Sequence, residues 1–258
     1  MPYLLVGFLI AILGMATGSY ASQITPEQAL TADLNRQLPA YEQTEQTVNG
    51  STFLLLQREN MTSFTKGTAI LVPDWSQHEA SPKHIDHLRQ QLNDYGWHTL
   101  AIMPPSYPEH PLSEDILQQY QLSLKARMEA AQRTAEQQSG VSIVIAQGSS
   151  AAVLNRLYAG KQLQEPAAFI MLGAYLPDQE LNRQLAKAVA SHQIPTLDIN
   201  HQYDNPYVSS QLKLRQQLAK KQLKAIYRQR QIVGSGYHYD EQEWVLQEIY
   251  GWLTSVGL

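Results

Sequence analysis

Apolar and amphipathic segments alternate along most of this 258-residue chain. Segments with the length and pattern of β-strands lie at 52–57, 67–72, 97–103, 141–146, 167–172, 195–200 and 224–232. Segments with helical spacing lie at 24–38, 82–95, 113–139, 148–157, 178–191, 206–221 and 240–253. Strands that alternate with helices in this way predict an α/β fold, with a mostly parallel central sheet and helices on both faces. No helix separates the first two strands, which predicts an antiparallel N-terminal edge.

One junction near the middle of the chain stands out. The strand that begins at Val141 runs into Gln147, Gly148, Ser149 and Ser150, and a helical segment follows at once. This pattern predicts a buried strand, a tight turn and a helix. In α/β enzymes such a junction is where the chain presents its chemistry. We therefore expect functional groups at this turn.

The N-terminus has the pattern of an export signal. The apolar run Leu4–Met15 is followed by small residues, and Ser19 and Ala21 match the small positions before a signal-peptidase cleavage site. An uncleaved membrane anchor is the alternative, because the run is close to spanning length. We expect cleavage after Ala21 and export to the periplasm, with membrane contact only if the leader is retained. The predicted organisation is a signal peptide at 1–21, a polar and helical extension at 22–44 and one α/β domain at 45–258.

Composition excludes several classes of protein and site. The net charge is −4 and there is no run of basic residues, which argues against a nucleic-acid partner. The chain has no cysteine, so disulfides, thiol catalysis and thiolate metal sites are excluded. No cofactor-binding motif is present, and we expect no cofactor.

The order of elements from about residue 45 onward resembles the α/β-hydrolase superfamily. Within it, the chain is most similar to a bacterial group of exported proteins without an assigned function. The segments that carry this resemblance are Leu71–His78, Leu92–Trp97 and Gly236–His238. The superfamily implies a nucleophile on a strained turn after a central strand, with an acid and a histidine supplied by later loops.

The nucleophile pattern G-x-Nuc-x-G aligns with Ala146–Ser150 and places Gly148 at the nucleophile position. The flanking residues are small enough for the turn, but the attacking side chain is missing. A slip of one residue would place Ser149 at the elbow, with the bulky Gln147 where the turn favours glycine. In a third interpretation, Gly148, Ser149 and Ser150 form only a close-packed turn and a helix cap.

The acid and base positions of the superfamily pattern are occupied. Asp204 follows the predicted strand 195–200, and His238 lies in a glycine-rich loop before the last helix. The resemblance implies a hydrogen bond between this carboxylate and this imidazole. The alternatives are an acid at the N-terminus of the helix that begins near Pro206, and a surface histidine.

The loop after the predicted strand 67–72 is a weaker candidate. Asp74 and Trp75 occupy the position of the oxyanion loop, and the backbone N–H groups of Trp75 and Ser149 are candidates to line an anion pocket with Gln147 nearby. The alternative for Trp75 is a loop residue that covers the sheet edge.

The remaining histidines do not have the spacing of a metal site. His78, His84 and His87 lack the i, i+4 pattern of helical zinc ligands, so we interpret them as solvated helix residues and expect no metal. His201 is expected to face the pocket, and Tyr107 and His110 to contact a ligand or form part of a lid.

Two functional interpretations follow. One is a non-catalytic α/β-hydrolase-like protein of the cell envelope that binds a small molecule, a glycan or an envelope protein. The other is a serine hydrolase that cleaves esters or amides with Ser149 or Ser150, His238 and Asp204. A purely structural envelope protein is a third, simpler possibility, because fold does not imply function.

Overall fold

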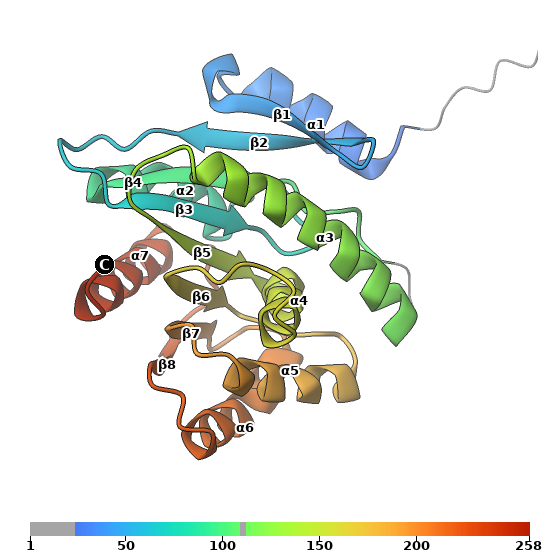
Figure 1. The fold of residues 1–258 in the computed structure, drawn as a ribbon, viewed down its shortest axis with the longest axis vertical. Helices are drawn as coiled ribbons and strands as arrows, with labels where there is room; N and C mark the ends of the chain where they lie inside the picture. The colour runs from blue at the N-terminus through green and yellow to red at the C-terminus, as the bar shows by residue number, and fades with distance from the viewer. Residues whose placement is uncertain (1–23, 109–111) are drawn as a thin grey trace, which may run out of the picture.

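The computed structural model describes residues 24–108 and 112–258, and the predicted leader, its cleavage site at Ala21 and His110 lie outside this range. Its centre is an eight-stranded sheet with the order β1-β2-β4-β3-β5-β6-β7-β8 (Figure 1). The strands are β1 Gln43–Val48, β2 Ser51–Arg58, β3 Gly67–Val72, β4 Trp97–Ile102, β5 Val141–Gln147, β6 Ala168–Leu172, β7 Thr196–His201 and β8 Tyr227–Ile232. The strands from β4 through β3 to β8 pair in parallel, whereas β1 and β2 form an antiparallel edge.

Helices cover both faces of this sheet, as the sequence pattern predicts. The helices α3, α4, α5 and α6 pack one against the next, and α2 packs against α7. The α-helices are α1 Pro26–Gln37, α2 Ile85–Gln91, α3 Glu114–Ala135, α4 Gly148–Ala159, α5 Gln179–Ser191, α6 Pro206–Lys221 and α7 Tyr239–Ser255. Short 3-10 helices lie at Ala40–Glu42 and Leu92–Tyr95. In the described part of the chain, none of the helices combines the length and apolar character that a membrane span requires.

Two elements differ from the sequence prediction. The strand β1 is polar and was not predicted, because its Gln, Thr and Glu side chains give no apolar alternation, and it pairs only with β2 at the sheet edge. It begins at Gln43, two residues before the predicted start of the α/β domain. The helix α2 begins at Ile85 rather than at Pro82, because His84 before it has a left-handed φ of 68°.

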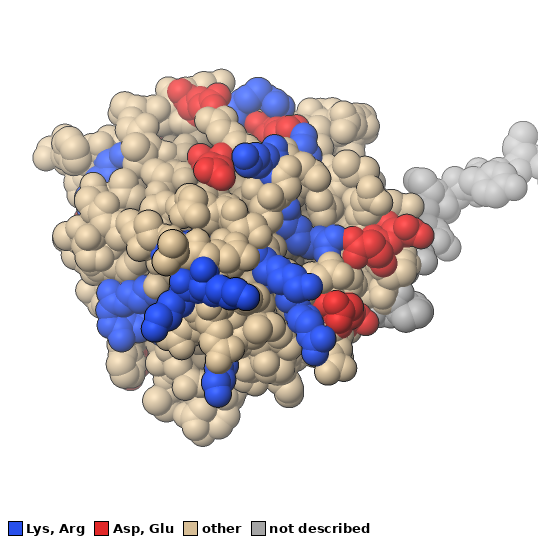
Figure 2. All heavy atoms as spheres, turned by 60° about the horizontal axis from the view of Figure 1, so that its bottom comes forward, with Lys and Arg blue, Asp and Glu red and all other residues tan. Residues whose placement is uncertain are grey.

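Charge is unevenly distributed along the chain. Residues 205–239 contain seven lysine and arginine residues and no aspartate or glutamate. Figure 2, which turns the α5 and α6 end of the sheet forward, shows basic side chains across the lower half of that face. Two of the seven, Arg215 and Lys224, are buried, and Arg228 and Arg230 pair with Glu248 of α7. The negative net charge is therefore carried by the rest of the chain.

Candidate functional site

The junction between β5 and α4 has the backbone of a strained turn. Gln147 is the last strand residue, and Gly148 begins the helix with a φ of 56°. This left-handed conformation is unfavourable for residues with a Cβ, and glycine adopts it freely. The chain therefore turns at Gly148, in the register of the first alignment, and Ser149 lies in the first turn of the helix.

The space above Gly148 is occupied by Asp74, from the loop after β3. A Cβ atom built on Gly148 would lie 2.1 Å from Asp74 Oδ1. That same oxygen accepts a hydrogen bond from the backbone N–H of Ser149 at 2.6 Å, and Asp74 Oδ2 accepts from Ser76 Oγ at 2.6 Å. A carboxylate from another loop thus lies where a nucleophile's side chain would begin.

This contact also corrects the expected anion pocket. In a hydrolase with this turn, the N–H of the residue after the nucleophile stabilises the oxyanion. Here that residue is Ser149, and its N–H is bound to Asp74. The role expected of the Trp75 backbone N–H stays a prediction, and the Trp75 side chain is buried against Tyr107 and Tyr120 in edge-on ring contacts. An external anion would have to displace the protein's own carboxylate.

Neither serine after the turn has a general base. Ser149 and Ser150 are completely buried, and Ser150 Oγ lies 3.4 Å from the hydroxyl of Tyr120. In the described ranges, no histidine ring forms a hydrogen bond with either serine hydroxyl. A serine without such a base is a weak nucleophile.

The expected bond between Asp204 and His238 is not formed. Asp204 Oδ1 pairs with Lys83 Nζ at 2.8 Å, and Oδ2 accepts from the backbone N–H of His201 at 2.7 Å. The N-cap of α6 is Asn205, so Asp204 does not cap that helix. His238 is solvent-exposed and precedes α7 without a side-chain capping bond. The Asp204 carboxylate therefore stabilises the loop after β7 and pairs with Lys83, and it does not orient the imidazole of His238.

A buried histidine pair lies next to this ion pair. His84 and His201 stack with their Nε2 atoms 2.9 Å apart, so one ring donates and the other accepts. A Cβ atom on Gly236 would lie 2.5 Å from His84 Nε2, so this glycine lets the late loop pack directly on the pair. Burial lowers the pKa of both imidazoles, and for His84 the neighbouring His201 and Lys83 lower it further.

The interpretation of His84 as a solvated helix residue is therefore wrong, because its exposed fraction is 1%. His87 is also largely buried, with its Nε2 atom 3.4 Å from a carboxylate oxygen of Glu243, and His78 is half-buried. The contact between His84 and His201 could not be predicted from local sequence patterns, because the two residues are 117 positions apart. No group of three or more metal-ligating side chains able to hold an ion exists among the described residues.

The histidine pair predicts a loss of stability in acid. Both rings have a pKa below the unfolded value of 6.5, so the stability that they contribute is present above about pH 6.5 and is lost as the pH falls below it. Lys83 opposes protonation of both rings, whereas Asp204 and Glu241 favour protonation of His201. The variant His84→Asn keeps a residue type that tolerates positive φ but removes one titrating group.

When the pH is lowered from 7.5 to 5, the free energy of unfolding should fall in both proteins. We expect the fall to be about 1 kcal/mol smaller in His84→Asn than in the wild type. Urea unfolding followed by circular dichroism at both pH values measures this difference. His238→Asn removes an exposed imidazole and is expected to retain the wild-type pH dependence. Equal pH dependence in the wild type and in His84→Asn would contradict the prediction.

A cavity of about 180 Å³ lies at the carboxyl ends of the central strands. Asp74, Gln147 and Gly148 line it together with Lys83 and Asp204. Tyr175, which follows β6, and Tyr237 of the late loop also line it, whereas His201 does not. Lys83, Tyr175 and Tyr237 were not predicted as site residues. Tyr175 lies just after a buried parallel strand, and strand-end position is the sequence signal that points to it.

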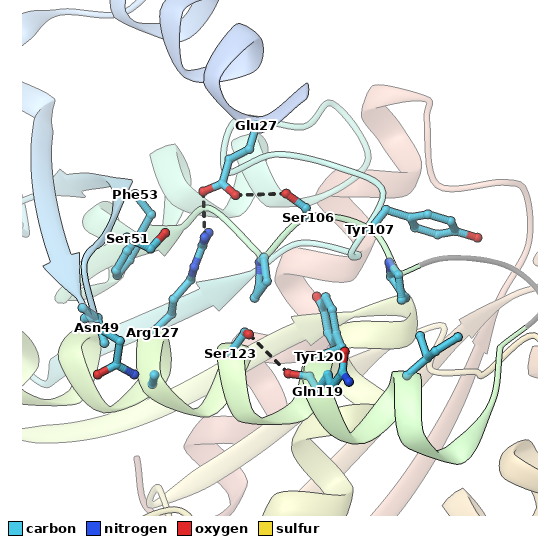
Figure 3. Close-up of a pocket in the computed structure, with 15 residues that line it drawn as sticks. Glu27, Asn49, Ser51, Phe53, Ser106, Tyr107, Gln119, Tyr120, Ser123 and Arg127 are labelled. Carbon is cyan, nitrogen blue, oxygen red and sulfur yellow. Dashed lines mark hydrogen bonds and ion pairs between the residues drawn. The ribbon is translucent and has the colours of Figure 1, made fainter. Parts of the chain in front are cut away.

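A larger cavity of about 610 Å³ lies between α1, the β1–β2 turn and α3 (Figure 3). Figure 3 shows Arg127 of α3 reaching Glu27 of α1, and their ion pair measures 2.7 Å. Arg127 also donates to the carbonyl oxygens of Met103 and Pro104 at 2.8 and 2.9 Å. Tyr107 lines this cavity rather than the one at the strand ends. Arg127 therefore binds α1 through Glu27 and the loop after β4 through two carbonyl oxygens.

The fold is that of the α/β hydrolases, and solved structures share it. Est1E from Butyrivibrio proteoclasticus superposes with a TM-score of 0.64 at 12% identity, over 83% of this chain and 98% of that one. An α-β serine hydrolase homologue from Coxiella burnetii gives 0.60 at 13% identity, over 83% and 97%. A soluble variant of monoglyceride lipase from Saccharomyces cerevisiae gives 0.58 at 10% identity, over 83% and 94%. At these identities the likeness establishes the fold alone.

The sequence comparison assigns the family. The chain belongs to the family described as "Protein of unknown function (DUF3530)", which matches residues 17–119 and 109–255. None of the curated proteins matches the chain in sequence.

Proposed function

We propose that this chain is an exported, non-catalytic α/β-hydrolase-fold protein that acts by binding a ligand at the carboxyl ends of its central strands. The observation that carries the proposal is the contact between Asp74 and the turn at Gly148. A carboxylate fills the position of the missing nucleophile and occupies the N–H group of Ser149. Acyl transfer needs both of these positions to be free.

The arrangement of the acid and base supports the same proposal. In a working triad, the carboxylate orients the imidazole and the imidazole activates the nucleophile. Here Asp204 pairs with Lys83, and His238 is exposed. The residue at the acid position thus forms an ion pair instead of a triad. The 180 Å³ cavity lies beside this ion pair and is available to a ligand.

A serine-directed probe tests the proposal. We expect purified, folded protein treated with a fluorophosphonate to show no covalent adduct by intact-mass spectrometry, because neither Ser149 nor Ser150 is hydrogen-bonded to a histidine. Hydrolysis of short-chain p-nitrophenyl esters is expected to be equal in the wild type and in Ser149→Ala. An active serine hydrolase, treated in parallel, controls for the reactivity of the probe.

The serine-hydrolase alternative makes the opposite prediction. One labelled serine, together with ester hydrolysis that Ser149→Ala or Ser150→Ala abolishes, would replace the binding function with an acyl-enzyme mechanism. Export is tested separately, by N-terminal sequencing of protein from the periplasmic fraction. A mature N-terminus at Ser22 is the expected result, and a retained Met1 in the membrane fraction would indicate an anchor.

A further inference from the structure

One polar atom of a residue that lines the 180 Å³ cavity has no hydrogen-bond partner within the protein. Gln147 lines the cavity, only 4% of this residue is exposed, and its Oε1 atom is buried without a hydrogen-bond partner. A buried amide oxygen without a hydrogen-bond donor is energetically unfavourable. A ligand that donates a hydrogen bond to this oxygen would remove that cost.

The charges of the cavity disfavour anionic ligands. Two carboxylates, Asp74 and Asp204, line it, and Lys83 is the cation that lines it with them. The ammonium group of Lys83 is already paired with Asp204. A phosphate or carboxylate would meet a net negative lining, with no unengaged backbone donor at Ser149.

Apolar ligands fit the lining no better. An acyl chain would leave Gln147 Oε1 unsatisfied and would further desolvate Asp74, which is itself buried. Hydroxyl groups suit such a lining because each can donate and accept in the same place. Burial raises the pKa of Tyr175 to about 12, so its phenol is protonated at neutral pH and adds no negative charge to the cavity.

The mouth of the cavity adds an aromatic surface. Tyr237 is 57% exposed, and Lys83 Nζ lies 5.7 Å from the centre of its ring. Tyrosine presents an apolar face beside a polar tip, which suits a ligand with both C–H and O–H groups on its surface. A volume of 180 Å³ equals that of about six water molecules, which is enough for one small ring and its hydroxyl groups.

We propose that this cavity binds one neutral sugar unit, with Gln147 and Asp74 accepting hydrogen bonds from its hydroxyl groups and Tyr237 covering one face. The inference rests on the proposed binding function and specifies its ligand class. The sugar is either a free monosaccharide or the end of a glycan, and both present the same hydroxyl chemistry.

Titration with defined sugars tests the ligand class. The probes are D-glucose, D-galactose, D-mannose and N-acetyl-D-glucosamine. Saturation-transfer NMR and isothermal titration calorimetry measure their binding. Glucose 6-phosphate and glucuronate are the anionic comparators. We expect at least one neutral sugar to bind and both anionic comparators to bind at least tenfold more weakly than it does. Disaccharides with the same terminal sugar separate the two sources: equal or tighter binding indicates a glycan end, and loss of binding indicates a free monosaccharide.

Three variants test the named contacts. Gln147→Met keeps the length of the side chain but removes the amide, and it is expected to weaken sugar binding about tenfold. Tyr237→Ala is expected to weaken it by a similar factor through loss of the ring surface. Gln216→Met makes the same replacement on the exposed face of α6 and is expected to leave affinity unchanged. Thermal unfolding of each variant verifies that it is folded.

Sugar binding that is unchanged in both Gln147→Met and Tyr237→Ala would overturn the proposal. Preference for the anionic comparators, or no binding of any neutral sugar at 50 mM, about fiftyfold above a dissociation constant of 1 mM, would also overturn it. These failures leave the proposed function standing if the fluorophosphonate labels no serine. A labelled serine removes the proposed function whatever the sugar results show.

Discussion

Gly148→Ser is expected to destabilise the protein by about 2–5 kcal/mol. Two physical effects add up in this variant. A side chain at position 148 is strained by the φ of 56°, and its Cβ would lie 2.1 Å from Asp74 Oδ1. Urea unfolding measures the difference in free energy, and the variant is expected to show no gain in ester hydrolysis.

The steric part of this effect should depend on Asp74. In the double variant Asp74→Gly, Gly148→Ser the carboxylate is absent, so we expect at least about 1 kcal/mol of favourable coupling in a double-mutant cycle. Gly160→Ser, at the C-cap of the same helix, where φ is negative, is the matched control and is expected to cost less than Gly148→Ser. Additive effects of the two substitutions at positions 74 and 148 would show that the carboxylate does not occupy the nucleophile position.

Arg215→Met is expected to destabilise the protein by about 3–5 kcal/mol, because it leaves the buried carboxylate of Asp198 without its cation. Both side chains are 0% exposed, and Arg215 Nη1 lies 3.2 Å from Asp198 Oδ2. Arg215 Nη2 also donates to the carbonyl oxygen of Ala174 at 2.6 Å. The pair therefore links α6, β7 and the loop after β6, which carries Tyr175.

The control for this variant lies on the same helix. Lys213 is exposed, and Lys213→Met is expected to change the free energy of unfolding by less than about 0.5 kcal/mol. Replacing both partners, as Asp198→Leu with Arg215→Met, removes the unpaired charge and is expected to recover part of the loss. A loss below about 1 kcal/mol in the single variant Arg215→Met would mean that the carboxylate is not held as a buried charge.

Local sequence signals were sufficient for most of the architecture. The spacing of apolar residues predicted the parallel strands and the helices between them, and Thr25 and Ser113 cap α1 and α3 at the positions that helix-start rules indicate. The same rules gave no account of β1, whose polar residues are held by pairing with β2. They also gave no account of His84, whose left-handed φ delays the start of α2.

The chain by itself determined the α/β pattern and the glycine at the turn after β5, because both depend on residues that are adjacent in sequence. Only the tertiary structure decided that Asp74 fills the place of the missing side chain, and that Asp204 pairs with Lys83. The reason is the strand order. Since β3 lies next to β5 in the sheet, the loop after β3 meets the turn after β5, although the two are 75 positions apart in the chain. Periodicity reports which face of an element is buried but not which element becomes its neighbour, so contacts of this kind follow from the folded arrangement alone.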